Sequence, residues 1–297
     1  MFKSGFYTIN IVRLGNAMED TLVGTEWLAL NFDNVNIFVI EVNAKAPERN
    51  EHIPGALVWD LHQTFEDSIR LDIINEIQFK NLMETNGITN ESTIVLYGDG
   101  DNRSATYAFW VFKYYRHHSV KILDGSIKKW KNDGNIIYAQ KNFLESQKIN
   151  TKSKYEVQKP DLSIRATKDV ILDNIEDLSI IDARTLDEFL GKSDGISTSV
   201  VGDSIRRCGR IPGSKHLEWS QLLNLDGTFK PIGQISEIVE QGNILTSKEI
   251  VTYCRLGVRA SYVWFVLKYL LNFSEVKNYD GSWTEWGNSV GVPIEID

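Results

Sequence analysis

Hydrophobic residues along this chain fall into short continuous runs, separated by longer segments of mixed polarity. The runs of strand length cover residues 36–42, 93–97, 120–123, 178–183 and 250–253. Apolar positions with helical spacing occupy residues 77–83, residues 107–115 and the segment that follows residue 259. A short helix is also expected at Thr25, with this threonine as its N-terminal cap. Apolar strands that alternate with helices predict an α/β fold, in which helices cover both faces of a mainly parallel sheet.

The same order of segments occurs twice in the chain. The tripeptides Ile-Pro-Gly and Asp-Gly-Ser are each found at two places, at residues 53–55 and 211–213 and at residues 124–126 and 280–282. The first pair lies 158 positions apart and the second pair 156 positions apart. A near-constant offset indicates a duplicated domain. We therefore predict one domain over residues 1–150 and a second over residues 151–297, with the Lys-, Ser-, Asn- and Gln-rich segment 142–160 as the linker.

Cys254 stands between the predicted strand at residues 250–253 and a helix, in the sequence Cys-Arg-Leu-Gly-Val-Arg. The N–H groups at the start of the helix, the helix dipole and the guanidinium groups of Arg255 and Arg259 all favour a thiolate at this point. Gly257 allows the loop to curl so that its amides converge on an anion. An isolated cysteine is more often an inert buried side chain. Its position at the carboxyl end of a parallel strand, where ligands bind, instead predicts an activated nucleophile.

The corresponding loop of the first copy lacks this chemistry. Residues 98–102 read Gly-Asp-Gly-Asp-Asn and contain no cysteine. Their two carboxylates would repel an anionic substrate. We therefore predict that the domain over residues 1–150 is inactive and forms one wall of a cleft beside the catalytic domain.

Charge and composition restrict the classes of partner. A net charge of −8 without a basic tract argues against nucleic acid, and no apolar run approaches the ~20 residues of a membrane-spanning helix. The first residues lack a signal-peptide pattern, and two cysteines make no disulfide framework, so a cytoplasmic location is expected. Cys208 lies in a polar loop, where an incidental exposed cysteine is favoured over a resolving thiol. The five histidines lack metal-ligand spacing, so neither a metal nor another cofactor is predicted.

Taken together, these motifs resemble the tandem-domain rhodaneses, a family of thiosulfate and mercaptopyruvate sulfurtransferases. The resemblance rests on the duplication, the Ile-Pro-Gly turns, the single loop cysteine of the second copy and the segment Tyr-Asp-Gly-Ser-Trp-Thr-Glu-Trp-Gly-Asn at residues 279–288. It extends from about Thr25 to Ile294 and implies two tandem rhodanese-like domains. The implied reaction moves sulfane sulfur from a small anionic donor to Cys254 as a persulfide, and then to cyanide or a thiol acceptor.

Physical chemistry assigns roles within this resemblance. Thiolate attack on the outer sulfur of thiosulfate is related to thiol–disulfide exchange, and it needs a thiolate, access and a good leaving group. Arg255 and Arg259 are expected to bind the donor and to stabilise the departing sulfite. The amides from Leu256 through Gly257 and Val258 to Arg259 are expected to hold the anionic persulfide.

The loop favours thiosulfate over mercaptopyruvate, because thiosulfate members of the family have Cys-Arg-Lys-Gly-Val-Thr and the arginine after Cys254 is kept. Leu256 replaces the lysine and Arg259 the threonine, and we hypothesise that Arg259 restores the lost positive charge. Vertebrate-type members place a substrate-binding arginine at the position of Glu188. Donor binding at that position is therefore in question.

Two further side chains are weaker candidates for substrate contact. Arg184, in the sequence Asp-Ala-Arg at the end of a predicted strand, fits either a substrate contact or, more often, a structural network. Trp283 is expected to line the cleft, because the first copy has Ile127 at the equivalent position. Trp286 repeats Trp130 and is expected in the core.

Three alternative functions remain open. The first is a mercaptopyruvate sulfurtransferase. The second is a cysteine phosphatase or arsenate reductase, although that class has five residues between cysteine and arginine and here four separate Cys254 from Arg259. The third is a carrier module that passes its persulfide to a protein acceptor in a sulfur relay. One intact reactive loop favours catalysis over a purely structural module.

Overall fold

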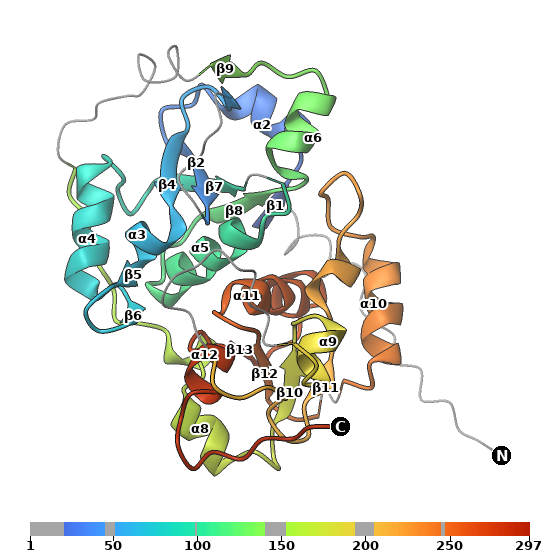
Figure 1. The fold of residues 1–297 in the computed structure, drawn as a ribbon. Coiled ribbons are helices and arrows are strands. Elements are labelled where there is room, and N and C mark those ends of the chain that lie inside the picture. Colours follow the sequence, from blue (N-terminus) through green and yellow to red (C-terminus); the bar gives the residue numbers. More distant parts are fainter. Residues whose placement is uncertain (1–20, 45–50, 99, 140–152, 194–204, 245–246) are drawn as a thin grey trace.

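The computed structural model describes residues 21–44, 51–98, 100–139, 153–193, 205–244 and 247–297. Two parallel sheets dominate them (Figure 1). The first sheet has the strand order β1 (Leu22–Val23), β8 (Val120–Leu123), β7 (Thr93–Tyr97), β2 (Ile37–Asn43) and β4 (Leu57–Asp60). The second has the order β11 (Lys215–His216), β10 (Ser179–Asp182), β12 (Ile250–Tyr253) and β13 (Val276–Asn278). The predicted α/β architecture with two similar parallel-sheet domains is confirmed.

Helices cover both faces of each sheet. The helices of the first half are α2 (Thr25–Asn31), α3 (Leu61–Phe65), α4 (Glu76–Thr85), α5 (Arg103–Tyr114) and α6 (Ser126–Asn132). Those of the second half are α8 (Lys168–Asp173), α9 (Leu186–Phe189), α10 (Ile232–Gln241), α11 (Val258–Phe265), which continues as the π-helical turn η3 (Val266–Leu270), and α12 (Ser282–Trp286). The 3-10 helices are η1 (Leu162–Ile164) and η2 (Trp219–Leu222). Two short antiparallel pairs, β3 (Glu51–His52) with β9 (Tyr138–Ala139) and β5 (Glu66–Asp67) with β6 (Asp72–Ile73), complete the described elements.

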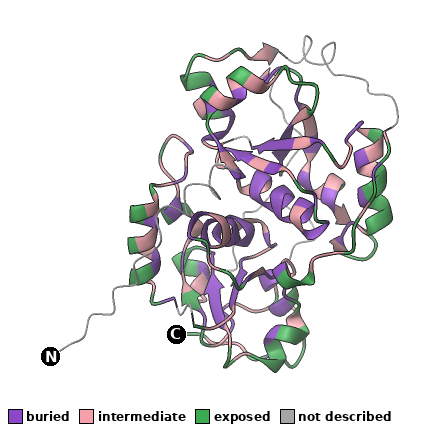
Figure 2. Cartoon of the chain, turned by 180° about the vertical axis from the view of Figure 1, so that it is seen from behind, coloured by how far each residue is buried: buried purple, intermediate pink, exposed green. Residues whose placement is uncertain are grey.

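Alternate residues of the strands point to opposite faces, which explains why the strands are apolar throughout. On β7, Ile94 belongs to the inner core and Val95 to an outer core packed under α2 and α6. On β12, Ile250 belongs to the inner core and Val251 to a second outer core packed under α8 and α12. Figure 2 shows the buried residues concentrated on the two sheets and on the helices between them. Each sheet is thus a central layer buried on both sides.

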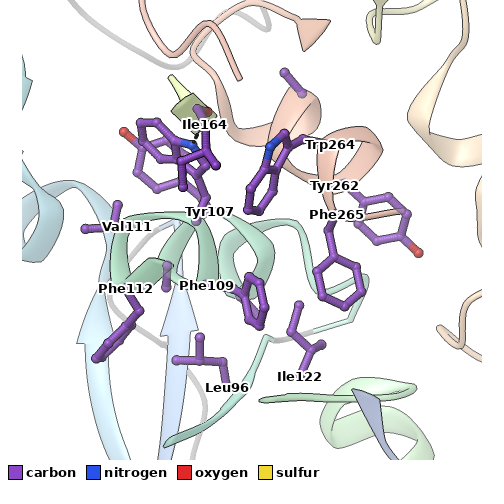
Figure 3. Packing of buried hydrophobic residues seen from close by; sticks show 14 of the residues in the cluster. Leu96, Tyr107, Phe109, Val111, Phe112, Ile122, Ile164, Tyr262, Trp264 and Phe265 are labelled. Carbon is purple, nitrogen blue, oxygen red and sulfur yellow. Dashed lines mark hydrogen bonds between the residues drawn. The ribbon is translucent and has the colours of Figure 1, made fainter. Parts of the chain in front are cut away.

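The two halves share their inner core through α5 and α11, which lie next to each other between the sheets (Figure 1). Figure 3 shows Phe109 of α5 facing Trp264 and Phe265 of α11. The rings of Phe109 and Phe265 meet edge to face with 5.0 Å between their centroids. Truncating one such buried aromatic typically costs ~3–5 kcal/mol. This apolar contact fixes the second sheet against the first.

The repeated Ile-Pro-Gly turn is attached to its sheet in the same way in both halves. The hydroxyl of Tyr97, at the end of β7, accepts the N–H of Ile53 at 3.2 Å and donates to Glu41 at 2.6 Å. In the second half, the hydroxyl of Tyr253 accepts the N–H of Ile211 at 3.2 Å and donates to Asp182 at 2.6 Å. The tyrosine at the end of each central strand therefore positions the turn of its own half.

Two local predictions need correction. Thr25 is not a helix cap: Gly24 precedes the first turn of α2, and the Thr25 hydroxyl donates to Asp133 Oδ2 at 2.5 Å. The helix predicted at residues 107–115 begins earlier, at Arg103.

The proposed linker falls partly outside the described residues. The division between residues 150 and 151 stays a prediction.

Candidate active site

Cys254 follows β12, a central strand of the second sheet, and only three residues separate it from α11. The last of these, Gly257, has a φ of +80°, and a Cβ atom there would lie 2.8 Å from the Cα atom of Asp280. Only glycine fits this position without displacing the backbone of the neighbouring loop. The strand–loop–helix arrangement at Cys254 agrees with the sequence-based expectation.

Ser282 holds the loop closed from the opposite side. Its Oγ atom accepts the backbone N–H groups of Cys254 and Gly257, each at 3.0 Å, and donates to the carbonyl of Tyr279 at 2.7 Å. The Gly257 amide is thus engaged within the protein, which corrects the expectation that it holds the persulfide. This role of Ser282 was not predicted, although the recurrence of Asp-Gly-Ser in both halves is a signal for the residue.

The sulfur lies below the surface. Cys254 is only 1% exposed, whereas Cys208 is half-buried. The side chains of Arg255, Leu256 and Val258 are half-buried around it. A thiol in such a place is shielded from bulk water, and a reactant has to enter the loop to reach it.

Arg259, in the first turn of α11, forms a two-pronged ion pair with Glu188 of α9. Its Nη1 and Nη2 atoms lie 2.6 and 2.8 Å from the two carboxylate oxygens, and the side chains are 16% and 3% exposed. Glu188 also accepts hydrogen bonds from the N–H and hydroxyl of Thr185, in a capping box at the start of α9. The carboxylate is therefore held on two sides.

The electrostatics of this pair extend to the sulfur. Burial by itself would lower the pKa of Arg259, but the Glu188 carboxylate and the electrostatic interaction with Cys254 raise it above its usual value. Burial would raise the pKa of Glu188, and the hydrogen bonds and charge of Arg259 lower it. Both groups are ionised at neutral pH, and the guanidinium interacts with Cys254 as well as with Glu188.

Arg184 does not reach a substrate position. Its guanidinium is 1% exposed, pairs with Asp182 at 2.6 Å and donates to the carbonyl of Gly209 at 2.7 Å. It also stacks over Trp283, with 4.6 Å from its central carbon to the ring. The structural network therefore describes Arg184 better than a substrate contact does.

Trp283 is likewise a core residue, which corrects its expected place in the cleft. It is 0% exposed, and its indole N–H donates to the carbonyl of Arg207 at 2.9 Å. The reason is that its side chain fills the space over Arg184 in the outer core. Trp286 is buried as expected.

A cavity of about 1200 Å³ lies between the two halves next to the reactive loop. From the reactive loop, Leu256 lines the cavity. From the first half, Tyr107 of α5 and the segment around β5 and β6 form its wall. Carboxylates predominate over cations in its lining. They are Glu66, Asp67, Asp72, Asp280 and Glu285, against the guanidinium groups of Arg70 and Arg165.

Arg165 connects the two halves within this cavity. Its Nη2 atom lies 2.6 Å from Asp72 in the first half and 2.8 Å from Asp280, against whose backbone Gly257 packs. Burial raises the pKa of Asp280, and the charge and hydrogen bonds of Arg165 oppose that shift. The position of the reactive loop is thus connected to the first half through one guanidinium group.

In the first half, Gly98 follows Tyr97 as Cys254 follows Tyr253. The side-chain oxygen of Asn102 accepts the Gly98 N–H at 2.8 Å, and its amide donates to the carbonyl of Leu123 at 2.6 Å. This loop therefore has an asparagine in its interior and no thiol. Asp101 pairs with Arg103 at 2.8 Å, and Asp99 lies outside the described residues.

Within the described ranges, no group of three or more His, Cys, Asp or Glu residues is arranged to hold a metal ion. None of the described helices combines the length and hydrophobicity of a membrane-spanning segment.

Comparison with known proteins identifies related chains over nearly the whole length. The family model described as "Rhodanese-like domain" matches twice, over residues 24–133 and 167–289. A protein of Saccharopolyspora erythraea with the name "Putative thiosulfate sulfurtransferase" is 39% identical over 278 residues, which are 93% of this chain and 96% of the relative. "Sulfur carrier protein TtuD" of Thermus thermophilus is 39% identical over 287 residues, 95% of this chain and 98% of that protein.

Solved structures show the same fold. The anaerobic ergothioneine biosynthesis enzyme from Chlorobium limicola, in complex with trimethyl histidine, superposes with a TM-score of 0.78 at 24% identity. The match covers 93% of this chain and 70% of that one.

Proposed function

Because this chain belongs to the rhodanese-like family of sulfurtransferases, we propose that it transfers sulfane sulfur through a persulfide on Cys254. The observation that supports this most directly is the position of the thiol. Cys254 lies at the carboxyl end of β12, in a loop closed by Ser282 and beside the guanidinium of Arg259. The positive charge of Arg259 at this place would stabilise the anionic persulfide that the transfer requires.

In the first step, the Cys254 thiolate attacks the outer sulfur of thiosulfate. A new S–S bond forms, the S–S bond of the donor breaks, and sulfite leaves with the electron pair of that bond. In the second step, cyanide or an acceptor thiolate attacks the outer sulfur of the persulfide. The product is thiocyanate or a new persulfide, and the Cys254 thiolate is regenerated without an external oxidant or reductant.

The loop residues have separate roles in this scheme. Arg255 and Arg259 bind the donor and stabilise the charge of the leaving sulfite. The backbone from Leu256 to Val258 surrounds the persulfide, and Gly257 provides the turn. Burial of the sulfur protects the persulfide from solvent between the two steps.

Thiosulfate is the proposed donor, since Arg255 follows the cysteine and relatives carry thiosulfate sulfurtransferase names. Mercaptopyruvate is the second candidate. A cysteine phosphatase is less well supported, because the loop between Cys254 and Arg259 is one residue shorter than that class requires.

The acceptor is proposed to be a thiol, either on a small molecule or on a protein of a sulfur relay. The cavity of about 1200 Å³ beside Leu256 accommodates an acceptor much larger than cyanide. The name of the relative TtuD is compatible with relay to a protein. The first half, whose loop has no thiol, is proposed to act as an inactive wall of this cavity.

Intact mass spectrometry tests the proposal. Incubation with thiosulfate should add about 32 Da, the mass of one sulfur atom, and cyanide should remove it. The Cys208→Ser variant should behave like the unmodified chain, whereas Cys254→Ser should gain nothing. An adduct that persists in Cys254→Ser, or the absence of an adduct with both thiosulfate and mercaptopyruvate, would refute the proposal. Hydrolysis of an aryl phosphate by the purified protein would favour the phosphatase instead.

A further inference from the structure

The ion pair between Arg259 and Glu188 changes the charge that a donor meets at the loop. Two guanidinium groups, Arg255 and Arg259, flank the thiol in sequence, but Glu188 neutralises one of them at 2.6 and 2.8 Å. In the reactive state the Cys254 thiolate adds a second negative charge, so the formal charges of Arg255, Arg259, Glu188 and the thiolate sum to zero. The loop in its reactive state therefore has no net positive charge left to offset a doubly charged donor.

The sequence departs from the related pattern at the same points. Leu256 stands in place of a lysine, and Glu188 stands where vertebrate-type members have an arginine. The structure contains one cation beside the loop, Arg259, that is fixed and compensated by Glu188.

The lining of the cavity next to the loop also disfavours a doubly charged donor, and this observation is independent of the ion pair. Five carboxylates and two guanidinium groups line it. Arg165 is already shared between Asp72 and Asp280, and Arg70 pairs with Asp67 at 3.1 Å. A donor that approaches through this cavity crosses a region of negative potential, which penalises each additional negative charge.

We propose that Glu188 sets the charge of the reactive loop, so that a sulfane donor with one negative charge reacts faster than the doubly charged thiosulfate ion, which remains a substrate. This inference rests on the proposed sulfurtransfer at Cys254. Glu188 is a positioning residue: it acts through Arg259, which it orients and neutralises, and takes no part in bond making.

Methanethiosulfonate is a suitable probe of donor charge. It has the same sulfane sulfur bonded to an oxidised sulfur, but a methyl group replaces one oxygen and the ion carries a single charge. The Cys254 thiolate attacks the sulfane sulfur, the donor S–S bond breaks, and methanesulfinate leaves with the electron pair in place of sulfite. The two donors therefore differ mainly in charge at the same reacting atoms.

The experiment compares kcat/KM for the two donors, with saturating cyanide, in three proteins. In Glu188→Gln, the amide still accepts a hydrogen bond from Arg259, but the compensating charge is gone. We expect the ratio of kcat/KM for thiosulfate to that for methanethiosulfonate to rise about tenfold, because the released positive charge acts on the second charge of thiosulfate. The control Asp187→Asn removes one charge from an exposed side chain of the same helix. It should change the ratio less than about twofold, because exposed charges are screened.

The double variant Glu188→Gln/Arg259→Gln separates charge from structure. It removes one negative and one positive charge, so the ratio should return to within about threefold of the unmodified value even if the absolute rates fall. A purely structural role of Glu188 would lower the rates with both donors equally and leave the ratio unchanged in every variant. An unchanged ratio in Glu188→Gln would overturn the inference.

The unmodified protein provides a test that does not depend on the folding of a variant. Raising the potassium chloride concentration from about 0.02 to 0.3 M shortens the screening length and should raise the ratio of thiosulfate to methanethiosulfonate activity. A fall in the ratio would indicate an uncompensated cationic site and would contradict the inference. If neither donor forms a persulfide, the proposed function itself fails, which is a different result.

Discussion

The side-chain oxygen of Ser282 accepts a hydrogen bond from the backbone N–H of Cys254 at 3.0 Å, across 28 positions of sequence. The same oxygen accepts the N–H of Gly257, so one hydroxyl fixes both ends of the turn that carries the thiol. The geometry of the reactive loop thus depends on a residue of the last helix.

Replacing Ser282 by alanine should leave two buried N–H groups without this acceptor. We expect a loss of about 2 kcal/mol in the free energy of unfolding and an approximately tenfold slower formation of the persulfide. Urea unfolding and time-resolved intact mass would measure these effects. The matched control is Ser126→Ala in the first half, where a serine of similar backbone conformation accepts a longer bond of 3.4 Å from Lys128. Equal effects of the two substitutions on persulfide formation would contradict a specific role of Ser282.

Gly257→Ala should reduce persulfide formation by about two orders of magnitude, because its Cβ would meet Asp280 backbone atoms at 2.8 and 2.9 Å and shift the loop. Gly213→Ala is the control: its φ is similarly positive, +74°, but no atom lies within 4 Å of the added Cβ. That variant should lose about 1 kcal/mol of stability from backbone strain and retain its activity. Near-normal rates for Gly257→Ala would show that the loop tolerates displacement.

Arg165→Met should leave the buried carboxylate of Asp280 without its partner. An uncompensated buried charge costs ~3 kcal/mol or more, and we expect that loss in the free energy of unfolding together with slower sulfur transfer. Asp72→Asn removes only the outer, partly exposed partner of Arg165 and should cost less than about 1 kcal/mol. The double variant Arg165→Met/Asp280→Asn should regain most of the lost stability. A failure to do so would mean that Arg165 acts through its packing against Tyr114.

His117 predicts a specific pH dependence of stability. It is 2% exposed and hydrogen-bonded to Tyr155 and to the carbonyl of Ser92, and burial lowers its pKa from 6.5 to about 4. Above pH 6.5 the ring is neutral in both the folded and the unfolded chain. As the pH falls from 6.5 to 4, His117 becomes protonated in the unfolded chain but stays neutral in the folded chain. Up to about 3 kcal/mol of the free energy of unfolding is therefore lost in this pH range.

The measurement is denaturant unfolding at pH 7 and pH 4.5. His117→Gln should show a smaller decrease in stability between these values than the unmodified chain, whereas His118→Gln, at an exposed neighbouring position, should show the same decrease. An identical pH dependence of all three proteins would exclude His117 as its source.

Much of the architecture follows from local sequence patterns. The strands at residues 93–97, 120–123 and 250–253 are found with the predicted bounds. A short continuous apolar run between turn residues is typical of a strand that is buried on both faces of a parallel sheet. The duplication also follows from the sequence, because the spacing between the repeated motifs stays nearly constant even where the residues of the two copies differ. The position of Cys254 between a strand and a helix depends on neighbours within ten residues, so it too was predictable.

The chemistry around the thiol depends on contacts that no local pattern contains. Glu188 and Arg259 are 71 positions apart and meet because α9 and α11 begin at the same edge of one sheet. The burial of Trp283 over Arg184 and the two hydrogen bonds to Ser282 arise in the same way. Short-range periodicity was enough to predict the fold class and the nucleophile. Which charges are compensated and which side chains belong to the core could not be predicted in this way, because these properties come from packing between distant segments.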